Sequence, residues 1–453
     1  SSGSDHGDHV SGTIMGAGNL DPIGRGMADG SFLYVYGSSN NNYYDVPNLY
    51  SNYDVTITSK SYSNGCNAGY TSLAQDLDLQ TNDHPSLIHV FSAGNNGTSD
   101  CGYGAGSGWG NVTGGHKQAK NVIAVANLTS IANLANSSSR GPAEDGRIKP
   151  DISAKGTSVY STEENQTYGT KTGTSMSCPG ISGVMAQLYH AYKSLNGNVN
   201  PPSGLMKCLM LNTADDIGNP GPDFKHGWGV VNSLRAVKAI ENNNFLSSSI
   251  EQNLSNTHNI NVPSNTLKLK VMVYWHDKEG STTAAKSLVN DINIQITDPS
   301  GQTFDPWVLN TTPSATLLDQ NATRGIDDLN NMEQVTIDNP QSGTYNLTVG
   351  GYSIPFGPQE YFVSYEVITE DLKLTYPIGG ESIVPGSQEI IRWDTHLSGS
   401  LIIEYSIDGG ATWGLITNSA NAENGYYYWN QTMPVTDSAL VRVSNQSFSS
   451  QSD

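Results

Sequence analysis

The chain has 453 residues, too many for one ordinary hydrophobic core, so we expect two or three domains. Its formal net charge is −20, from 22 Lys+Arg against 42 Asp+Glu, which makes nucleic acid and anionic membrane surfaces poor partners. The sequence has no run of 18 apolar residues, so we expect no membrane span. Abundant Gly and Tyr with only 14% charged residues are common in extracellular β-rich proteins.

The first part of the chain alternates short apolar runs with segments of helical period. The runs include SLIHVFSAGN (86–95) and NVIAVANLT (121–129), and this alternation is typical of a parallel sheet flanked by helices. Two helices are expected, over 174–195 and from 203 to about 213, and Pro and Ser stand at the start of the second. We therefore predict an α/β domain over residues 1–245.

The rest of the chain has apolar residues at a period of two. LKLKVMVYWHD (267–277) and GTYNLTVGGY (343–352) are examples, and turn signals such as DPSG separate such runs. They indicate an antiparallel sandwich or jelly roll over 246–370. A second all-β module over 371–453, with a DGG turn and Trp393, suits an immunoglobulin-like or fibronectin-like sandwich. The predicted fold class is α/β, with a parallel-sheet domain followed by two all-β sandwich domains.

The four cysteines divide into two kinds. Cys66 and Cys101 lie in loops rich in Gly and Asn, where a disulfide would stabilise the fold by roughly 3 kcal/mol on loop-entropy arguments; the sequence leaves the paired and unpaired states equally open. Cys178 and Cys208 lie in apolar helical stretches and are interpreted as buried thiols, with a second bridge as the alternative.

One serine stands at the start of a predicted helix among small residues. The segment GTSMSCPGISG (173–183) contains it as Ser175. A serine is a weak nucleophile at its ordinary pKa, so it needs a neighbouring base and donors aimed at the developing oxyanion. The helix N-terminus supplies a positive dipole and the Ser175 N–H supplies a donor. Ser175 is therefore a candidate nucleophile.

Two further motifs offer a base and a second donor. DHGDHVSGT (5–13) places His6 and His9 at what reads as a helix start. Such a pair can supply a base or two metal ligands, and His9 is also readable as a packed core residue. FSAGNNG (91–97) ends a strand in small residues and presents Asn95, whose amide can donate to an oxyanion, although this motif alone is usually a turn.

In the order His, Asn, Ser, the motifs HGDHVSGT, SAGNNG and GTSMSCP together resemble those of the subtilisin-like serine proteases. The resemblance covers residues 5–245 and implies that His6 is the general base, Ser175 the nucleophile and Asn95 the oxyanion donor. The resemblance also implies that His9 has a structural role rather than a catalytic one. The implied activity is that of a secreted serine endopeptidase acting on protein or peptide substrates, with no cofactor in catalysis.

The same resemblance implies a substrate cleft. TITSKSYS (56–63) corresponds to the edge strand to which an extended substrate pairs by β-augmentation, and the GNNG segment closes the base of the primary specificity pocket. The implied substrate-binding residues are Ser61, Tyr62, Ser63, Ser92, Ala93 and Gly94. Apolar or aromatic residues before the scissile bond are the family expectation. The region 247–370 is similar to the C-terminal β-barrel of alkaline bacterial members.

Two features depart from the family pattern. The aspartate that orients the histidine lies before the His motif in this family, yet only five residues precede His6, and Asp5 adjoins it too closely to be assigned that role. Since the chain begins SSGSDHGDHV without an initiator Met, we expect a processed or truncated product and an N-terminal fragment that supplies the aspartate. Without it, kcat falls about 10⁴-fold in this family. Asp8, also unassigned, is expected to raise the pKa of the base.

Calcium and two other functions are the remaining expectations. Asp277, Asp291 and Asp328 lie near predicted strand ends, and acidic, oxygen-rich loops are what a structural Ca²⁺ requires; solvated surface acids are the alternative. A catalytically impaired scaffold that acts as an adhesion or binding module is the alternative function. A metal-dependent hydrolase using the two histidines would need a carboxylate ligand motif that we do not find.

Overall fold

The computed structural model describes residues 5–36, 44–62 and 65–453. The chain forms two compact units. The first holds the residues up to 261 together with 270–337 and 343–366, and the second holds 262–269, 338–342 and 367–453. The division of the chain at residues 245 and 370 into three domains stays a prediction.

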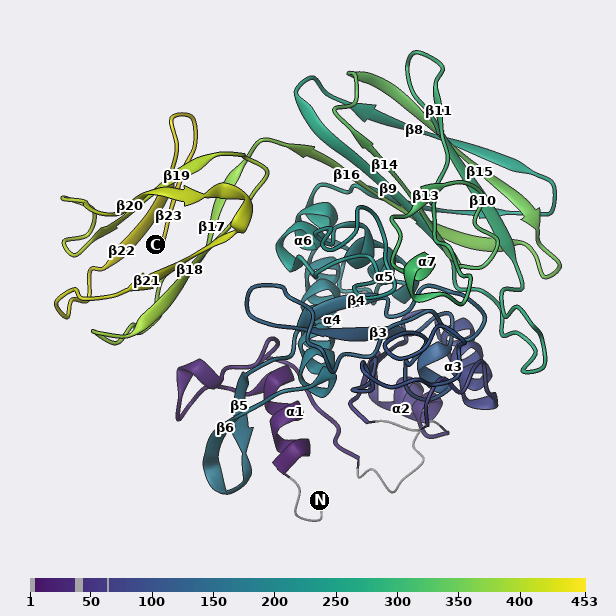
Figure 1. Cartoon of the computed structure of the whole chain (residues 1–453), viewed down its shortest axis with the longest axis horizontal. Helices are drawn as coiled ribbons and strands as arrows, with labels where there is room; N and C mark the ends of the chain where they lie inside the picture. The colour runs from purple at the N-terminus through teal and green to yellow at the C-terminus, as the bar shows by residue number, and fades with distance from the viewer. Residues whose placement is uncertain (1–4, 37–43, 63–64) are drawn as a thin grey trace. The chain divides into compact units, whose positions relative to one another are not determined.

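A four-stranded sheet forms the centre of the α/β part of the first unit (Figure 1). Its strands are β1 (Ile57–Lys60), β2 (Ile88–Ser92), β3 (Ile123–Leu128) and β4 (Ile152–Lys155), in that spatial order and all parallel. The middle strands β2 and β3 are buried along their whole length, as parallel strands covered on both faces must be. The predicted parallel sheet is confirmed, and β1 and β4 are its edge strands.

Helices surround this sheet. The long helix α4 packs against all four strands of the sheet, and its bounds coincide with the predicted 174–195. The helix predicted from residue 203 ends at Asn212. The six helices described in the α/β part, excluding short 3₁₀ turns, are α1 (Asp5–Met15), α2 (Val46–Tyr53), α3 (Ser72–Asp83), α4 (Thr174–Leu195), α5 (Ser203–Asn212) and α6 (Ser233–Glu241).

A hairpin of two antiparallel strands, β5 (Val159–Glu163) and β6 (Thr167–Lys171), joins the sheet to α4. Strand β5 packs against α1. The first helix of the chain is therefore held between this hairpin and α4, against which it also packs.

The first β region follows α6 and runs from β7 to β16. Two four-stranded sheets, β14-β9-β16-β7 and β11-β10-β15-β8, account for most of it. The antiparallel pairs recorded there agree with the predicted sandwich. Its elements are β7 (Phe245–Ile250), β8 (Ser255–Val262), β9 (Thr266–Tyr274), β10 (Asp291–Thr297), β11 (Thr303–Phe304), β12 (Trp307–Val308), α7 (Ala315–Leu318), β13 (Thr323–Arg324), β14 (Met332–Asp338), β15 (Gly343–Ser353) and β16 (Gln359–Thr369).

Helix α5 joins the α/β part to the first β region. All ten of its residues are buried, and its Cys208 Sγ lies 3.5 Å from Met272 O on β9 and 3.6 Å from Phe362 O on β16. Residues of β2, β3, α4 and α5 share one hydrophobic core with Met272 and Phe362. A helix that is apolar on every side is stable only when it is covered on every side.

The C-terminal module consists of seven strands in two sheets, β17-β18-β21 and β20-β19-β22-β23, with antiparallel pairing throughout. Its core is apolar and contains Trp393, whose indole N–H donates to Ala422 O at 2.8 Å. The strands are β17 (Leu372–Tyr376), β18 (Gln388–Thr395), β19 (Ser400–Ser406), β20 (Gly414–Asn421), β21 (Tyr426–Asn430), β22 (Leu440–Ser444) and β23 (Ser449–Gln451). The predicted class, a parallel-sheet α/β domain followed by antiparallel sheets, is confirmed.

Candidate active site

Ser175 lies in the first turn of α4 and is half-buried. Gly173 precedes the helix with a φ of 155°, in the region that favours glycine. A Cβ at Gly173 would stand 3.4 Å from Asn95 Nδ2, so the absence of a side chain keeps open the space between the serine and the asparagine. The N–H groups of a first helical turn have no partner within the helix, which leaves the Ser175 N–H available as a donor.

Asn95 follows β2 with an exposed side chain that is fixed at one end. Its Oδ1 accepts hydrogen bonds from the Thr174 N–H at 3.0 Å and from Thr174 Oγ1 at 3.1 Å. Because the oxygen is occupied by two donors, the NH₂ end is the end left for a ligand, and no described residue accepts a hydrogen bond from it. The structure therefore places Asn95 beside the start of α4 with a free donor.

His6 lies in the first turn of α1 and is half-buried. Burial lowers the pKa of His6 below its ordinary value, and the positive charge of Lys171 adds to this effect, while Asp5 opposes it. The expectation that Asp8 raises this pKa is wrong, because desolvation dominates. Among the described residues no hydrogen bond joins His6 to Ser175, whose Oγ instead donates over 3.5 Å to Ser61 O; catalytic hydrogen bonds are often long or absent without substrate.

His9 belongs to the core of the α/β part. It is fully buried, and its Nε2 donates to Val159 O on β5 at 3.0 Å. In the described part of the chain, no group of three or more His, Cys, Asp or Glu side chains is arranged to hold a metal ion. This agrees with the packed-core interpretation of His9 and leaves the metal-dependent hydrolase without support.

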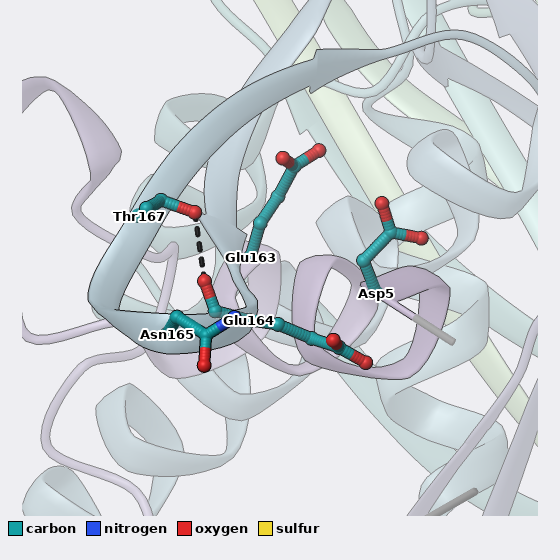
Figure 2. A pocket seen from close by; sticks show the side chains of 5 residues that line it. All are labelled: Asp5, Glu163, Glu164, Asn165 and Thr167. Carbon is teal, nitrogen blue, oxygen red and sulfur yellow. Dashed lines mark hydrogen bonds between the residues drawn. The ribbon is translucent and has the colours of Figure 1, made fainter. Parts of the chain in front are cut away.

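Asp5 is engaged with the β5–β6 hairpin. Lys171 Nζ lies 2.8 Å from Asp5 Oδ2 and 2.8 Å from Glu163 Oε1. Figure 2 shows Asp5 at the start of α1, facing a depression whose other lining residues are Glu163, Glu164, Asn165 and Thr167. The ion pair ties α1 to the hairpin. Within the described residues no carboxylate is hydrogen-bonded to His6, so the orienting aspartate is still to be accounted for.

The predicted substrate strand ends beside the nucleophile. Ser61 Oγ donates to Ser175 O at 2.9 Å, and Tyr62 is exposed; Ser63 lies outside the described residues. In the part of the chain that the structure describes, β1 is one of the two edge strands of the parallel sheet, so its outer edge is open to pairing with an extended peptide. The structure thus brings Ser61 next to Ser175 and leaves Tyr62 accessible.

The other side of the cleft is the end of β2. Ser92, Ala93 and Gly94 are buried there, and the Gly94 N–H donates to Thr174 Oγ1 at 3.2 Å. Thr113 packs behind them, because a Cβ on Gly94 would meet Thr113 Oγ1 at 2.4 Å. The strand end is therefore held against both the start of α4 and the loop that contains Thr113.

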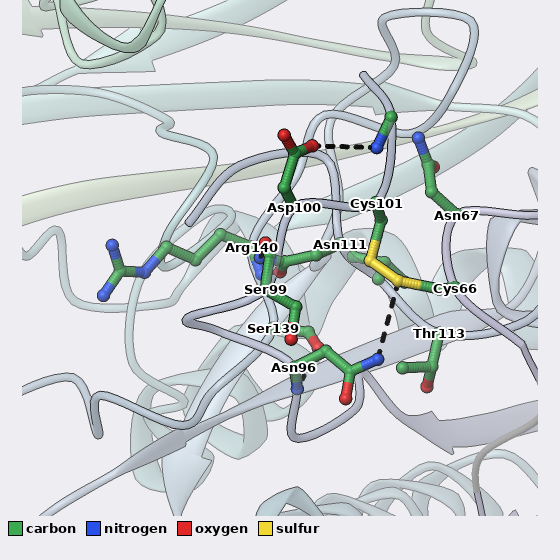
Figure 3. Close-up of a disulfide and its surroundings, with 12 residues drawn as sticks. Cys66, Asn67, Asn96, Ser99, Asp100, Cys101, Asn111, Thr113, Ser139 and Arg140 are labelled. Carbon is green, nitrogen blue, oxygen red and sulfur yellow. Dashed lines mark hydrogen bonds between the residues drawn. A yellow bond between two sulfur atoms is a disulfide. The ribbon is translucent and has the colours of Figure 1, made fainter. Parts of the chain in front are cut away.

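A disulfide joins Cys66 to Cys101, whose Cα atoms lie 5.5 Å apart, so of the two states that the sequence leaves open the structure has the paired one. It connects the loop after the substrate strand with the loop after Asn95, and Asn96 Nδ2 lies 3.6 Å from Cys66 Sγ (Figure 3). Cys178 and Cys208 are free and buried, which confirms their interpretation as thiols and excludes the second bridge.

The three aspartates expected to bind calcium lie in different surroundings. Asp277 is fully buried, and its carboxylate pairs with Lys120 Nζ at 2.5 Å while accepting the N–H groups of Val289 and Asn290. Its charge is thus neutralised by a lysine. Asp291 Oδ2 and Asp328 Oδ2 each lie 3.7 Å from Lys286 Nζ, and of the two aspartates Asp291 is buried and Asp328 is exposed. The structural calcium at these three aspartates stays a prediction.

Sequence reasoning missed Thr113, His116 and Lys117, which lie directly behind the cleft. His116 and Lys117 form part of the 3₁₀ turn η2 (His116–Gln118), and all three residues are buried. The only sequence signal was a pair of basic residues inside GGHKQAKN (114–121), which reads as an exposed turn.

Comparison with known proteins identifies the family of the chain. Residues 1–229 match the model of the Subtilase family, Peptidase_S8. Subtilisin DY of Bacillus licheniformis is 29% identical over 241 residues, which are 52% of this chain and 78% of that protein. A thermostable alkaline protease of Halalkalibacterium halodurans is 27% identical over 236 residues, 51% of this chain and 58% of that protein. The solved structure of Sphericase is 26% identical, covering 50% of this chain and 77% of its own, with a TM-score of 0.40.

No helix in the described ranges is long and apolar enough to cross a membrane. The family match extends over half of the chain and contains all three motifs that surround the cleft. The chain belongs to the subtilase family and is a subtilisin-like serine endopeptidase.

Proposed function

We propose that this chain is a secreted endopeptidase in which Ser175 is the nucleophile, His6 the general base and Asn95 an oxyanion donor. The observation that carries the proposal is the fixed geometry at the start of α4. Thr174 holds the oxygen of the Asn95 amide through two hydrogen bonds, so the NH₂ group needs no rearrangement when charge develops on the substrate.

The reaction follows from these groups. Ser175 Oγ attacks the scissile carbonyl while His6 takes its proton, and the oxyanion accepts hydrogen bonds from the Ser175 N–H and Asn95 Nδ2. The tetrahedral intermediate collapses as His6 gives the proton to the leaving amine, which leaves an ester on Ser175. Water, deprotonated by His6, then attacks the ester and releases the acid.

The extended substrate pairs with the free edge of β1, which ends one residue before Ser61. The fall in the pKa of His6 caused by burial keeps its imidazole neutral at physiological pH, which is the form that a general base needs. An aspartate from an N-terminal segment orients this imidazole, as the family pattern implies, and that segment is therefore a proposed partner.

The proposal is tested by labelling the full-length protein with a fluorophosphonate and identifying the modified residue by mass spectrometry. We expect the label on Ser175, and we expect His6→Ala to slow labelling about 10³-fold or more. His190→Ala is the matched control, because His190 is exposed on α4, the helix that bears Ser175. This change should leave the labelling rate unchanged. A folded protein without labelled Ser175 would contradict the proposal and favour a scaffold that only binds.

A further inference from the structure

Lys117 is a buried lysine, and the hydroxyl group of Thr113 separates it from the expected cleft. The Lys117 side chain, on η2, is fully buried, and its Nζ donates to Thr113 Oγ1 at 2.7 Å. Thr113 in turn donates to Ala93 O, through its N–H at 3.0 Å and through its hydroxyl at 3.3 Å. Ala93 belongs to the strand end that forms one wall of the expected specificity pocket, so the ammonium stands immediately behind that wall.

The opposite wall contacts the same 3₁₀ turn. The ring of Tyr62, from the substrate strand, stacks on the ring of His116 with 5.4 Å between the centroids. Phe91, near the end of β2, meets His116 edge-on at 5.0 Å. The turn that bears Lys117 therefore touches both segments that the family resemblance assigns to substrate binding.

Lys60 is a second buried lysine near the expected specificity pocket. Lys60 is the last residue of β1 and is buried, with Nζ 5.7 Å from the centroid of the Phe91 ring. His116 adds no positive charge, because burial and the two lysines lower its pKa to about 3. The positive charge on this side of the cleft is thus contributed by Lys60 and Lys117.

Among the described residues, no carboxylate forms an ion pair with Lys117. The other fully buried lysines of this unit are paired: Lys149 and Lys207 share Asp151, and Lys120 faces Asp277. Burial without a carboxylate lowers the pKa of Lys117 to about 7. An ammonium buried without a counter-charge is costly to the fold, and ionisable groups with such perturbed pKa values gather at functional sites.

We propose that Lys117 makes the primary specificity pocket select an acidic side chain, Glu or Asp, at the substrate residue that precedes the scissile bond. The inference rests on the proposed function, since it assigns the substrate class of the same cleft. The carboxylate of the substrate supplies the counter-charge that the protein omits, across a Thr113 side chain that is small and polar. This selection departs from the apolar or aromatic preference expected from the family.

The test uses the full-length protein and three peptidyl diphenyl phosphonates that differ only in the residue bearing the phosphonate, which is a Glu, Gln or Leu analogue. Each reagent reports the pocket through its rate of covalent attachment to Ser175. The Glu reagent is expected to react at least ten-fold faster than the Gln reagent, which matches it in size. In Lys117→Met the ratio of the two rates should fall toward one, and the Leu reagent should react faster than in the unaltered protein.

Two matched variants separate charge from packing. Lys117→Arg keeps the charge and should keep the Glu preference. Lys193→Met removes a partly exposed lysine of α4 that contacts Asn200, and it should leave all three rates unchanged. If Lys117→Met does not fold, the ratio in the unaltered protein and in Lys117→Arg still decides the question.

The outcomes distinguish this inference from the proposed function. Labelling of Ser175 at equal rates by the Glu and Gln reagents would overturn the acidic preference and leave the protease proposal standing. Failure of all three reagents and of the fluorophosphonate on folded protein would overturn the proposed function and, with it, this inference.

Discussion

Two regions of the first unit bury lysine side chains, and they differ in what faces the ammonium group. Beside the central sheet, Asp151 lies between Lys149 Nζ at 2.5 Å and Lys207 Nζ at 3.1 Å. Burial alone would raise the pKa of Asp151, but the two lysines hold it below its ordinary value. Behind the cleft, Lys117 faces the hydroxyl of Thr113. The neutralised lysines therefore serve the fold, whereas Lys117 has no carboxylate partner among the described residues, and the proposed acidic side chain of the substrate would supply its counter-charge.

The largest change in stability is expected from removing the carboxylate that Lys149 and Lys207 share. Asp151→Asn leaves two ammonium groups buried without a carboxylate, and we expect it to lower the free energy of unfolding by about 3–5 kcal/mol, measured by urea titration. Asp29→Asn is the control, because the Asp29–Arg25 pair is exposed and should contribute less than about 1 kcal/mol. A loss at Asp151 no larger than at Asp29 would erase the distinction between the two regions.

A smaller effect is expected from the covalent tie on the cleft side. Replacing Cys66 and Cys101 together by Ser removes a link across a sequence separation of 35. Loop entropy predicts that this change lowers the free energy of unfolding by roughly 3 kcal/mol. The midpoint of thermal unfolding should fall to that of the unaltered protein under reducing conditions, because reduction breaks the same bond. An unchanged midpoint would show that ion pairs and packing alone hold the cleft.

The smallest effect concerns Lys117 and depends on pH. Its pKa is about 7 in the folded protein, against an ordinary 10.5, so between these values the unfolded chain binds more protons and stability rises with pH. Lys117→Met should therefore stabilise the protein at pH 6, by about 1–3 kcal/mol, and the gain should shrink toward pH 10. Lys207→Met should instead destabilise it.

Other groups near Lys117 set the background of that measurement. Burial lowers the pKa of Lys60 to about 7. Lys60 therefore also makes stability rise with pH, and this contribution remains in the Lys117→Met variant. His116 and Cys178 stay neutral through most of the range, since burial lowers the pKa of the first and raises that of the second. A stability difference between Lys117→Met and the unaltered protein that did not change with pH would point to packing rather than charge.

The local patterns of the sequence predicted much of the fold. The bounds of α4 followed from helical period, and the parallel strands followed from continuous apolar runs bounded by small residues. His9 was readable as a core residue from its place in a helix start. These features depend on neighbours in the chain, which a sequence displays directly.

The features that escaped prediction depend on distant neighbours. The stretch from 108 to 128 is buried throughout, although GGHKQAKN within it has the composition of an exposed turn, and its burial results from packing against other loops. The effect of Asp8 on His6 was mispredicted because desolvation and Lys171 decide that pKa. The ion pair of Asp277 with Lys120 also escaped prediction, because Lys120 lies 157 positions earlier in the chain.

Helix α5 also bears on how such a protein can evolve. Six of its ten buried residues lie in one hydrophobic core with Met272 on β9 and Phe362 on β16, so the α/β part and the first β region share part of their apolar interior. Recombination between genes at the junction of the two regions would therefore expose the apolar residues that meet in this shared core.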